Sequence, residues 1–98
     1  MSFSPSSSKT LLMPEISRFY GIVIRMFYDD HNPPHFHALY GDDEAWVNIN
    51  TLAVFHGSLP SRALGLMIEW ASMHQDELRL DWELARKQQK PEKIAPLK

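Results

Sequence analysis

The sequence predicts an α+β fold, in which a four-stranded, mainly antiparallel sheet carries one or two C-terminal helices packed on one face. Two patterns support this fold class. Between residues 18 and 55, apolar and polar side chains alternate in short runs separated by turn residues, as strands do. Between residues 61 and 89, apolar side chains recur at steps of three and four, as in a helix that lies on a sheet.

Composition limits the classes of protein to consider. A chain of 98 residues, of which 44% are hydrophobic, fits one small domain. It contains no cysteine, so a disulfide framework and thiolate metal ligands are excluded. The net charge of -2 gives no overall attraction to nucleic-acid phosphates. Because neither a secretion signal nor a long apolar run is apparent, we expect a cytoplasmic protein with no membrane partner.

The chain divides into three segments. Residues 1–12 contain five serines and little apolar surface, so we expect a disordered leader, with Met13 as an alternative start. Residues 13–90 form the predicted single α+β domain. Residues 91–98 contain two prolines and no periodicity, so we expect an extended or disordered C-terminal tail.

The first predicted strand is long and ends at a rigid turn. It runs from Arg18 to Tyr28 and has one apolar face, formed by Tyr20, Ile22, Ile24, Met26 and Tyr28. The next six residues, DDHNPP, form the turn, because Asp and Asn bond to their own backbone and proline does not fit a central strand.

Three shorter strands complete the predicted meander. In the strand from His35 to Tyr40, the core takes every second side chain: Phe36, Ala38 and Tyr40. His35 and His37 therefore turn to the opposite face of the sheet, which no helix is expected to cover. Residues 44–50 and 52–55 give the third and fourth strands.

A helix after Ser58, the expected N-cap, covers the apolar face. Unbroken to Gln89 it would be roughly 45 Å long, far longer than the strands beneath it. We therefore expect a break between His74 and Asp76, with Asp76 capping the second segment. Because His74 falls within the apolar stripe, we expect it to be partly buried and hydrogen-bonded.

The histidines beside the turn could bind a divalent metal. His35 and His37 at positions i and i+2 of a strand project about 7 Å apart, from where two imidazoles can converge on one ion. His31 could be a third ligand, and Asp29 or Asp30 could supply a carboxylate. Apart from such an ion, no cofactor is expected.

The same histidines also suit metal-independent ribonuclease chemistry. One neutral and one protonated imidazole can activate a ribose hydroxyl and protonate the leaving oxygen, with His31 or Arg25 assisting. The residues expected to bind the RNA substrate lie on the same face: Asn48 and Asn50 for phosphate, and Trp46 for stacking on a base. The alternative is structural, with the histidines bonding to backbone carbonyls or carboxylates around the turn.

Two long stretches carry a family resemblance. They are MPEISRFYGIVIRMFYDDHNPPHFHALYG, from Met13, and LPSRALGLMIEWASMHQDELRLDWELAR. With its ISRFYGI and DHNPPHFH elements, and its helix phrase around Glu69 and Trp70, the chain closely resembles a family of small bacterial proteins catalogued as domain of unknown function 4160. The resemblance covers about residues 13–97. The signature histidines correspond to His31, His35 and His37, and have no assigned roles.

The resemblance implies a genetic context rather than a reaction. Family members resemble components of two-gene modules, often encoded beside a second small protein, and are suspected of belonging to toxin-antitoxin systems. We therefore hold two hypotheses of different class: a toxin-like ribonuclease or RNA-binding component, and a non-catalytic interaction module that neutralises a partner encoded by the neighbouring gene. A divalent-metal site is compatible with either.

Overall fold

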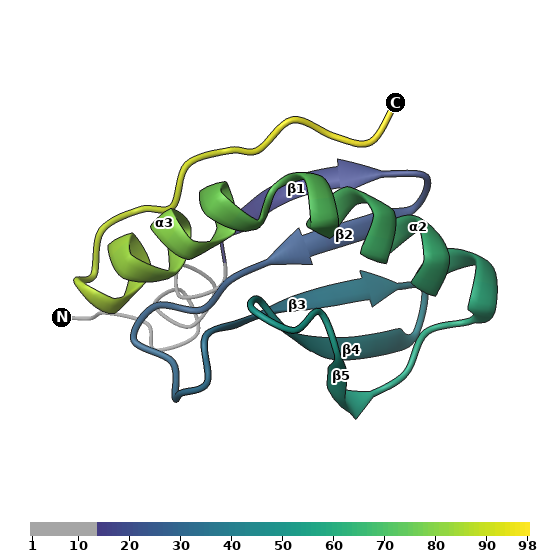
Figure 1. Ribbon diagram of the computed structural model, residues 1–98, viewed down its shortest axis with the longest axis horizontal. Coiled ribbons are helices and arrows are strands. Elements are labelled where there is room, and N and C mark those ends of the chain that lie inside the picture. The colour runs from purple at the N-terminus through teal and green to yellow at the C-terminus, as the bar shows by residue number, and fades with distance from the viewer. Residues whose placement is uncertain (1–13) are drawn as a thin grey trace, which may run out of the picture.

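A computed structural model describes residues 14–98, so the predicted leader, residues 1–12, lies outside the described residues. The α+β fold class is confirmed: an antiparallel meander is followed by two C-terminal helices (Figure 1). The strands, in sheet order, are β1 (Glu15–Phe19), β2 (Ile22–Arg25), β3 (His35–Tyr40), β4 (Asp43–Asn48) and β5 (Val54–Gly57). The helices are α2 (Ser61–Met73) and α3 (Gln75–Arg86).

The described sheet has five strands and not the four expected, because the first predicted strand is a hairpin. The chain reverses at Tyr20 and Gly21, which both have positive φ, +49° and +82°. Two consecutive positive φ angles suit the turn that joins antiparallel strands through two residues. Phe19 pairs with Ile22, so both side chains face the core, whereas an unbroken strand would place them on opposite faces. The prediction that Tyr20 belongs to the apolar face was therefore wrong, because its side chain is 57% exposed.

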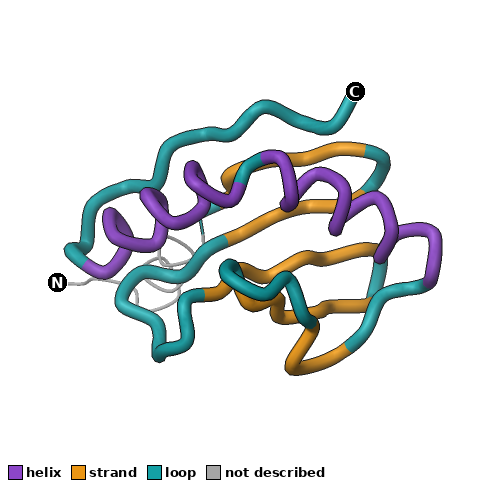
Figure 2. The backbone as a smooth tube through the Cα atoms, viewed as in Figure 1, coloured by secondary structure: helices purple, strands orange, loops and turns teal. Residues whose placement is uncertain are grey.

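The helices cover one face of the sheet, and the core lies between the two layers (Figure 2). Trp70 of α2 is fully buried, with its ring centroid 5.2 Å from that of Phe19 and 6.0 Å from that of Phe36. The strand residues predicted to face the core are buried: Ile22, Ile24, Met26, Phe36 and Ala38. The prediction for Tyr40 was wrong, because this side chain at the end of β3 is 37% exposed.

The predicted break in the long helix is confirmed at His74, which separates α2 from α3. The predicted caps were wrong. Pro60 and not Ser58 precedes α2, and Asp76 lies inside the first turn of α3, where its negative charge still favours the helix dipole. His74 is partly buried as expected, since its imidazole contacts Trp70 and bonds to the Glu77 carboxylate.

The C-terminal segment, residues 91–98, runs extended along the fold and passes beside β1 (Figure 1). Ile94 is buried, and its backbone N–H donates to the Ile16 carbonyl at 2.8 Å. The Trp70 indole N–H donates to the Ala95 carbonyl, also at 2.8 Å. The segment thereby covers the outer edge of β1 and part of α2.

Neither helix in residues 14–98 has the length and apolar character needed to cross a membrane.

Candidate functional site

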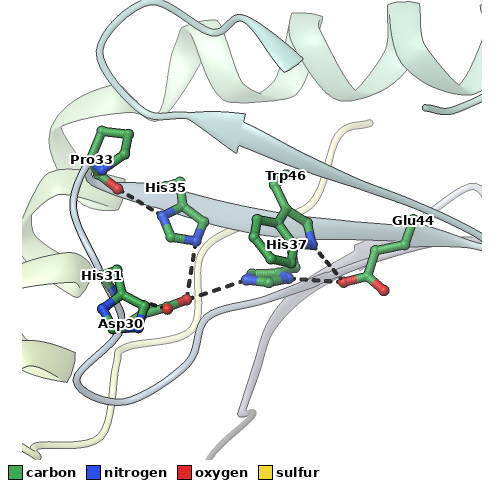
Figure 3. A network of polar contacts seen from close by, with 7 residues as sticks. All are labelled: Asp30, His31, Pro33, His35, His37, Glu44 and Trp46. Atoms are coloured by element: carbon green, nitrogen blue, oxygen red, sulfur yellow. Dashed lines mark hydrogen bonds and ion pairs between the residues drawn. The ribbon is translucent and has the colours of Figure 1, made fainter. Parts of the chain in front are cut away.

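The turn after β2 and the start of β3 bring one carboxylate and two imidazoles together. Asp30, His35 and His37 each offer a ligand atom, and these three atoms lie within 4.8 Å of one another. Asp30 Oδ2 is 3.0 Å from His35 Nε2 and 3.4 Å from His37 Nε2. In Figure 3, dashed lines from the Nε2 atoms of both rings meet at one oxygen of the Asp30 carboxylate.

Backbone contacts fix the turn that carries Asp30. Asp29 has a positive φ of +51°, and its N–H donates to the Ala85 carbonyl at the end of α3. At the other end of the turn, the Pro34 carbonyl accepts the N–H of Ile49. The DDHNPP segment is therefore tied to both a helix and the β4–β5 connection, which holds the Asp30 carboxylate over β3.

Both histidines are buried, so the expectation that they lie on an uncovered face was wrong. Each is 3% exposed. Aromatic rings fill much of the space around the imidazoles, and one of these rings belongs to helix α3. The rings with centroids 4.4–5.7 Å from one or both imidazoles are Phe27, Trp46, Phe55 and Trp82.

The second nitrogen of each ring has its own acceptor. His35 Nδ1 lies 2.7 Å from the carbonyl oxygen of Pro33, and His37 Nδ1 lies 2.9 Å from Glu44 Oε2. Trp46 also donates its indole N–H to Glu44 Oε2, at 3.0 Å. The hydrogen bond with His37 is the main reason that the pKa of the Glu44 carboxyl is lower than usual.

One nitrogen in the cluster has no hydrogen bond. His35 Nε2 is at ion-pair distance from Asp30, yet it has no hydrogen-bond partner among the described residues. A buried polar atom without a partner costs about 1–3 kcal/mol. The atom therefore has a lone pair or a proton available toward Asp30.

Of the other predicted metal ligands, His31 and Asp29 do not join the group. Both are exposed, and the ligand group within residues 14–98 contains neither. The backbone N–H of His31 donates to the Asp30 carboxylate at 2.8 Å, so His31 supports the cluster through its main chain.

The predicted substrate-binding residues have separate positions. Trp46 pairs with His37 in the β3–β4 register and lies against the cluster. Asn48 accepts the backbone N–H groups of Asn50 and Thr51, and so holds a turn. Asn50 accepts a hydrogen bond from Arg79 of α3 through its side chain. Arg25, opposite His37 in β2, is partly buried and has an interaction partner.

The sequence alone did not identify Glu44 as part of the site. It lies on β4 diagonally from His37, since Trp46 is the residue directly opposite. The spacing of Glu44 and Trp46, two residues apart on one strand, is a signal that they share a face. Only the register between β3 and β4 brings that face to His37.

Comparison with known protein families gives a match that includes this cluster. The model of the domain of unknown function DUF4160 matches residues 21–83, which include the whole Asp30, His35 and His37 cluster. The chain belongs to the DUF4160 family. No curated protein and no solved structure matches it.

Proposed function

We propose that this DUF4160 protein binds a divalent transition-metal ion through Asp30, His35 and His37. One observation carries the proposal: the three ligand atoms, from two imidazoles and one carboxylate, converge within 4.8 Å in a largely buried setting. Imidazole nitrogen and carboxylate oxygen are the usual ligands of zinc and of similar divalent metals when no thiolate is present.

The two distances from the carboxylate oxygen to the imidazole nitrogens also suit a metal. Bonds of about 2.1 Å from one ion, at angles between octahedral and tetrahedral, place neighbouring donor atoms about 3.0–3.4 Å apart. The carboxylate oxygen lies 3.0 Å from one imidazole nitrogen and 3.4 Å from the other. Three protein ligands would leave at least one coordination position for water or another ligand, as in catalytic rather than structural metal sites.

Burial gives the ribonuclease hypothesis less support. A general base must come within hydrogen-bond reach of the ribose hydroxyl, directly or through one water. His35 and His37 are each 3% exposed, with rings packed around them. A small ion fits such a site more readily than a phosphodiester does.

The metal content of the full chain, purified without an affinity His tag, tests the proposal. We expect close to one zinc-class ion per chain after equilibration with Zn²⁺ and removal of excess ion. A His35→Ala, His37→Ala double variant should retain none, while the matched control His31→Ala should retain it. Wild-type protein that remains free of metal, or a double variant that binds as well as the wild type, would contradict the proposal.

The second candidate function is that of an interaction module in a toxin-antitoxin-like pair. The exposed edge strand β5 supports this candidate. This strand lies at the edge of the sheet, and Phe55 on it is 45% exposed. An edge strand offers unpaired backbone groups to which a partner can add a strand. The proposed partner is the small protein encoded by the neighbouring gene.

Co-expression with that small protein tests this candidate. We expect a complex in size-exclusion chromatography that Phe55→Asp weakens. The control Tyr20→Asp, at the distant β1–β2 turn and also exposed, should leave the complex intact. The two proteins eluting separately would rule out the pairing. The toxin hypothesis has a separate test, because cells that express the chain alone and grow normally with intact RNA would contradict it.

A further inference from the structure

Glu44 holds His37 from the side opposite Asp30. A carboxylate can only accept hydrogen bonds, and His37 faces two of them: Glu44 Oε2 lies 2.9 Å from Nδ1 and Asp30 Oδ2 lies 3.4 Å from Nε2. The shorter contact, with Glu44, favours the hydrogen on Nδ1. When the imidazole is neutral, its lone pair is then on Nε2, the atom that faces Asp30. Glu44 thus selects which nitrogen of His37 is available as a ligand.

The tautomer of His35 is fixed in the same way, by the carbonyl group of Pro33. The Pro33 carbonyl, 2.7 Å from His35 Nδ1, is also only an acceptor. The lone pair of neutral His35 is therefore on Nε2, which is buried and has no hydrogen-bond partner. Both imidazoles consequently present the same nitrogen, in the same protonation form, to the space beside Asp30 (Figure 3).

We infer that Glu44 is the positioning residue of this metal centre, acting on the ligand His37; the inference rests on the proposed metal-binding function. Histidine ligands commonly donate their second N–H to a carboxylate or a carbonyl, which fixes the ring and makes its other nitrogen a stronger donor. Glu44 and the Pro33 carbonyl take these two roles here.

The sheet holds Glu44 in place through both its side chain and its backbone. The side chain accepts a hydrogen bond from the Trp46 indole. The backbone carbonyl of Glu44 lies so close to Gly57 that a Cβ atom there would be 2.0 Å from the oxygen. Gly57 also has a φ of +74°, which glycine adopts without strain. The close approach of β5 therefore fixes the main chain from which the carboxylate projects.

This arrangement favours one class of ion. Two neutral nitrogen donors suit zinc and its neighbours, whereas Mg²⁺ prefers oxygen ligands and keeps several of its waters. Asp30 as a ligand and Glu44 behind His37 together supply two negative charges, which balance the charge of a divalent ion in a largely buried site. The centre is thus expected to bind Zn²⁺ in preference to Mg²⁺.

A set of variants of the full chain tests the role of Glu44. Glu44→Ala removes the acceptor, whereas Glu44→Gln keeps an oxygen that can still accept from His37. Asp43→Ala is the matched control, because it removes an exposed carboxylate from the neighbouring position of β4. Two quantities are measured: the Zn²⁺ affinity, and the tautomer of His37 in the metal-free protein, from ¹⁵N chemical shifts at pH 8.

The expected outcomes differ among the variants. Wild-type His37 should have its hydrogen on Nδ1, and Glu44→Ala should give a mixture of tautomers with Zn²⁺ affinity about 10–100-fold lower. Glu44→Gln should keep the tautomer and most of the affinity, and Asp43→Ala should match the wild type. A loss of packing alone would not change the tautomer.

Two other results would overturn the inference, and they are distinguishable. If Glu44→Ala retains both the tautomer and the affinity of the wild type, Glu44 is not a positioning residue, although the metal centre stands. If the wild type binds no Zn²⁺, the proposed function fails and the assignment of Glu44 fails with it.

Discussion

Two carboxyl groups of this fold, Asp30 and Asp81, are removed from solvent in different ways. The Asp30 side chain is 19% exposed and faces two imidazole nitrogens. Asp81, on α3 beside the C-terminal segment, is 1% exposed and faces no cation among its described contacts. One of its oxygens accepts the backbone N–H of Glu92 at 2.9 Å, and the other has no hydrogen-bond partner.

The difference shows how a fold accommodates a buried acid. Burial raises the pKa of Asp81 from 3.8 to about 6; the Glu92 N–H opposes this shift, and the charges of Glu92 and Glu77 add to it. A carboxylate without a nearby cation is thus neutralised most readily by a proton. Asp30 has two imidazoles in front of it, so a metal ion bound between them could balance its charge.

The same substitution at both positions gives the largest expected contrast. Asp30→Asn keeps the shape of the side chain but removes the negative ligand, and we expect Zn²⁺ affinity to fall at least about 1,000-fold, or ~4 kcal/mol. Asp81→Asn should leave the affinity unchanged. Calorimetric titration with Zn²⁺ measures both. If both variants lose Zn²⁺ affinity equally, the affinity depends on the general stability of the fold and not on Asp30 as a ligand.

The next contrast is in stability and its dependence on pH. Because folding raises the pKa of Asp81 from 3.8 to about 6, this group stabilises the folded protein most below pH 4, and that contribution is lost as pH rises through 6. Asp81→Asn should therefore raise the free energy of unfolding by up to about 3 kcal/mol at pH 7.5, and by little at pH 4.

Urea unfolding of Asp81→Asn and wild type at both pH values checks this expectation. The variant keeps an oxygen that can accept the Glu92 N–H, so the hydrogen bond is not the quantity tested. A variant that is less stable than the wild type at pH 7.5 would show that the Asp81 carboxylate has a favourable partner when charged.

Zinc should stabilise the fold through one of these two regions only. At a free concentration of 100 times the dissociation constant, Zn²⁺ is expected to raise the free energy of unfolding by about 2.7 kcal/mol. We expect this gain in the wild type and in Asp81→Asn, and none in Asp30→Asn. Thermal unfolding with and without Zn²⁺ measures it. Stabilisation of all three proteins alike would indicate a second Zn²⁺ site elsewhere.

The smallest expected effect comes from Glu92→Gln. This variant removes a negative charge that raises the pKa of Asp81, while the backbone N–H remains. Because Glu92 is exposed and its charge is screened, we expect a gain of only about 0.3 kcal/mol in unfolding free energy at pH 7.5. Urea unfolding at low salt measures the difference, and a clear loss of stability would contradict the expected repulsion.

Local pattern was sufficient to predict most of the fold. Period-two alternation identified the core side chains of β2 and β3, except at Tyr40. The break at His74 was predicted because an unbroken helix would be far longer than the strands that it covers. The β1–β2 turn was missed, because Tyr20 is an unusual residue for a positive φ and the run of apolar residues is unbroken across the turn. The turn changes which residues face the core, since Phe19 and Ile22 share a face across it.

The candidate site was predictable only in part. The spacing of His35 and His37 gave two of the three residues of the Asp/His cluster, and the turn gave Asp30 as one of two alternatives. The burial of the histidines was not predictable, because it comes from rings on other elements, including Trp82 of α3. Glu44 and Asp81 were missed for a similar reason, since each acquires its role from a distant segment.

The sequence by itself determined which side chains share a face within each strand or helix, because strand and helix periods are local properties of the backbone. It also determined that no thiolate can be a metal ligand, because the chain has no cysteine. Tertiary structure alone decided that Asp30 meets the imidazoles, that Glu44 meets His37, and that Asp81 lies beneath the C-terminal segment. These contacts depend on strand register, turn direction and long-range packing, which set distance and burial and which no local period contains.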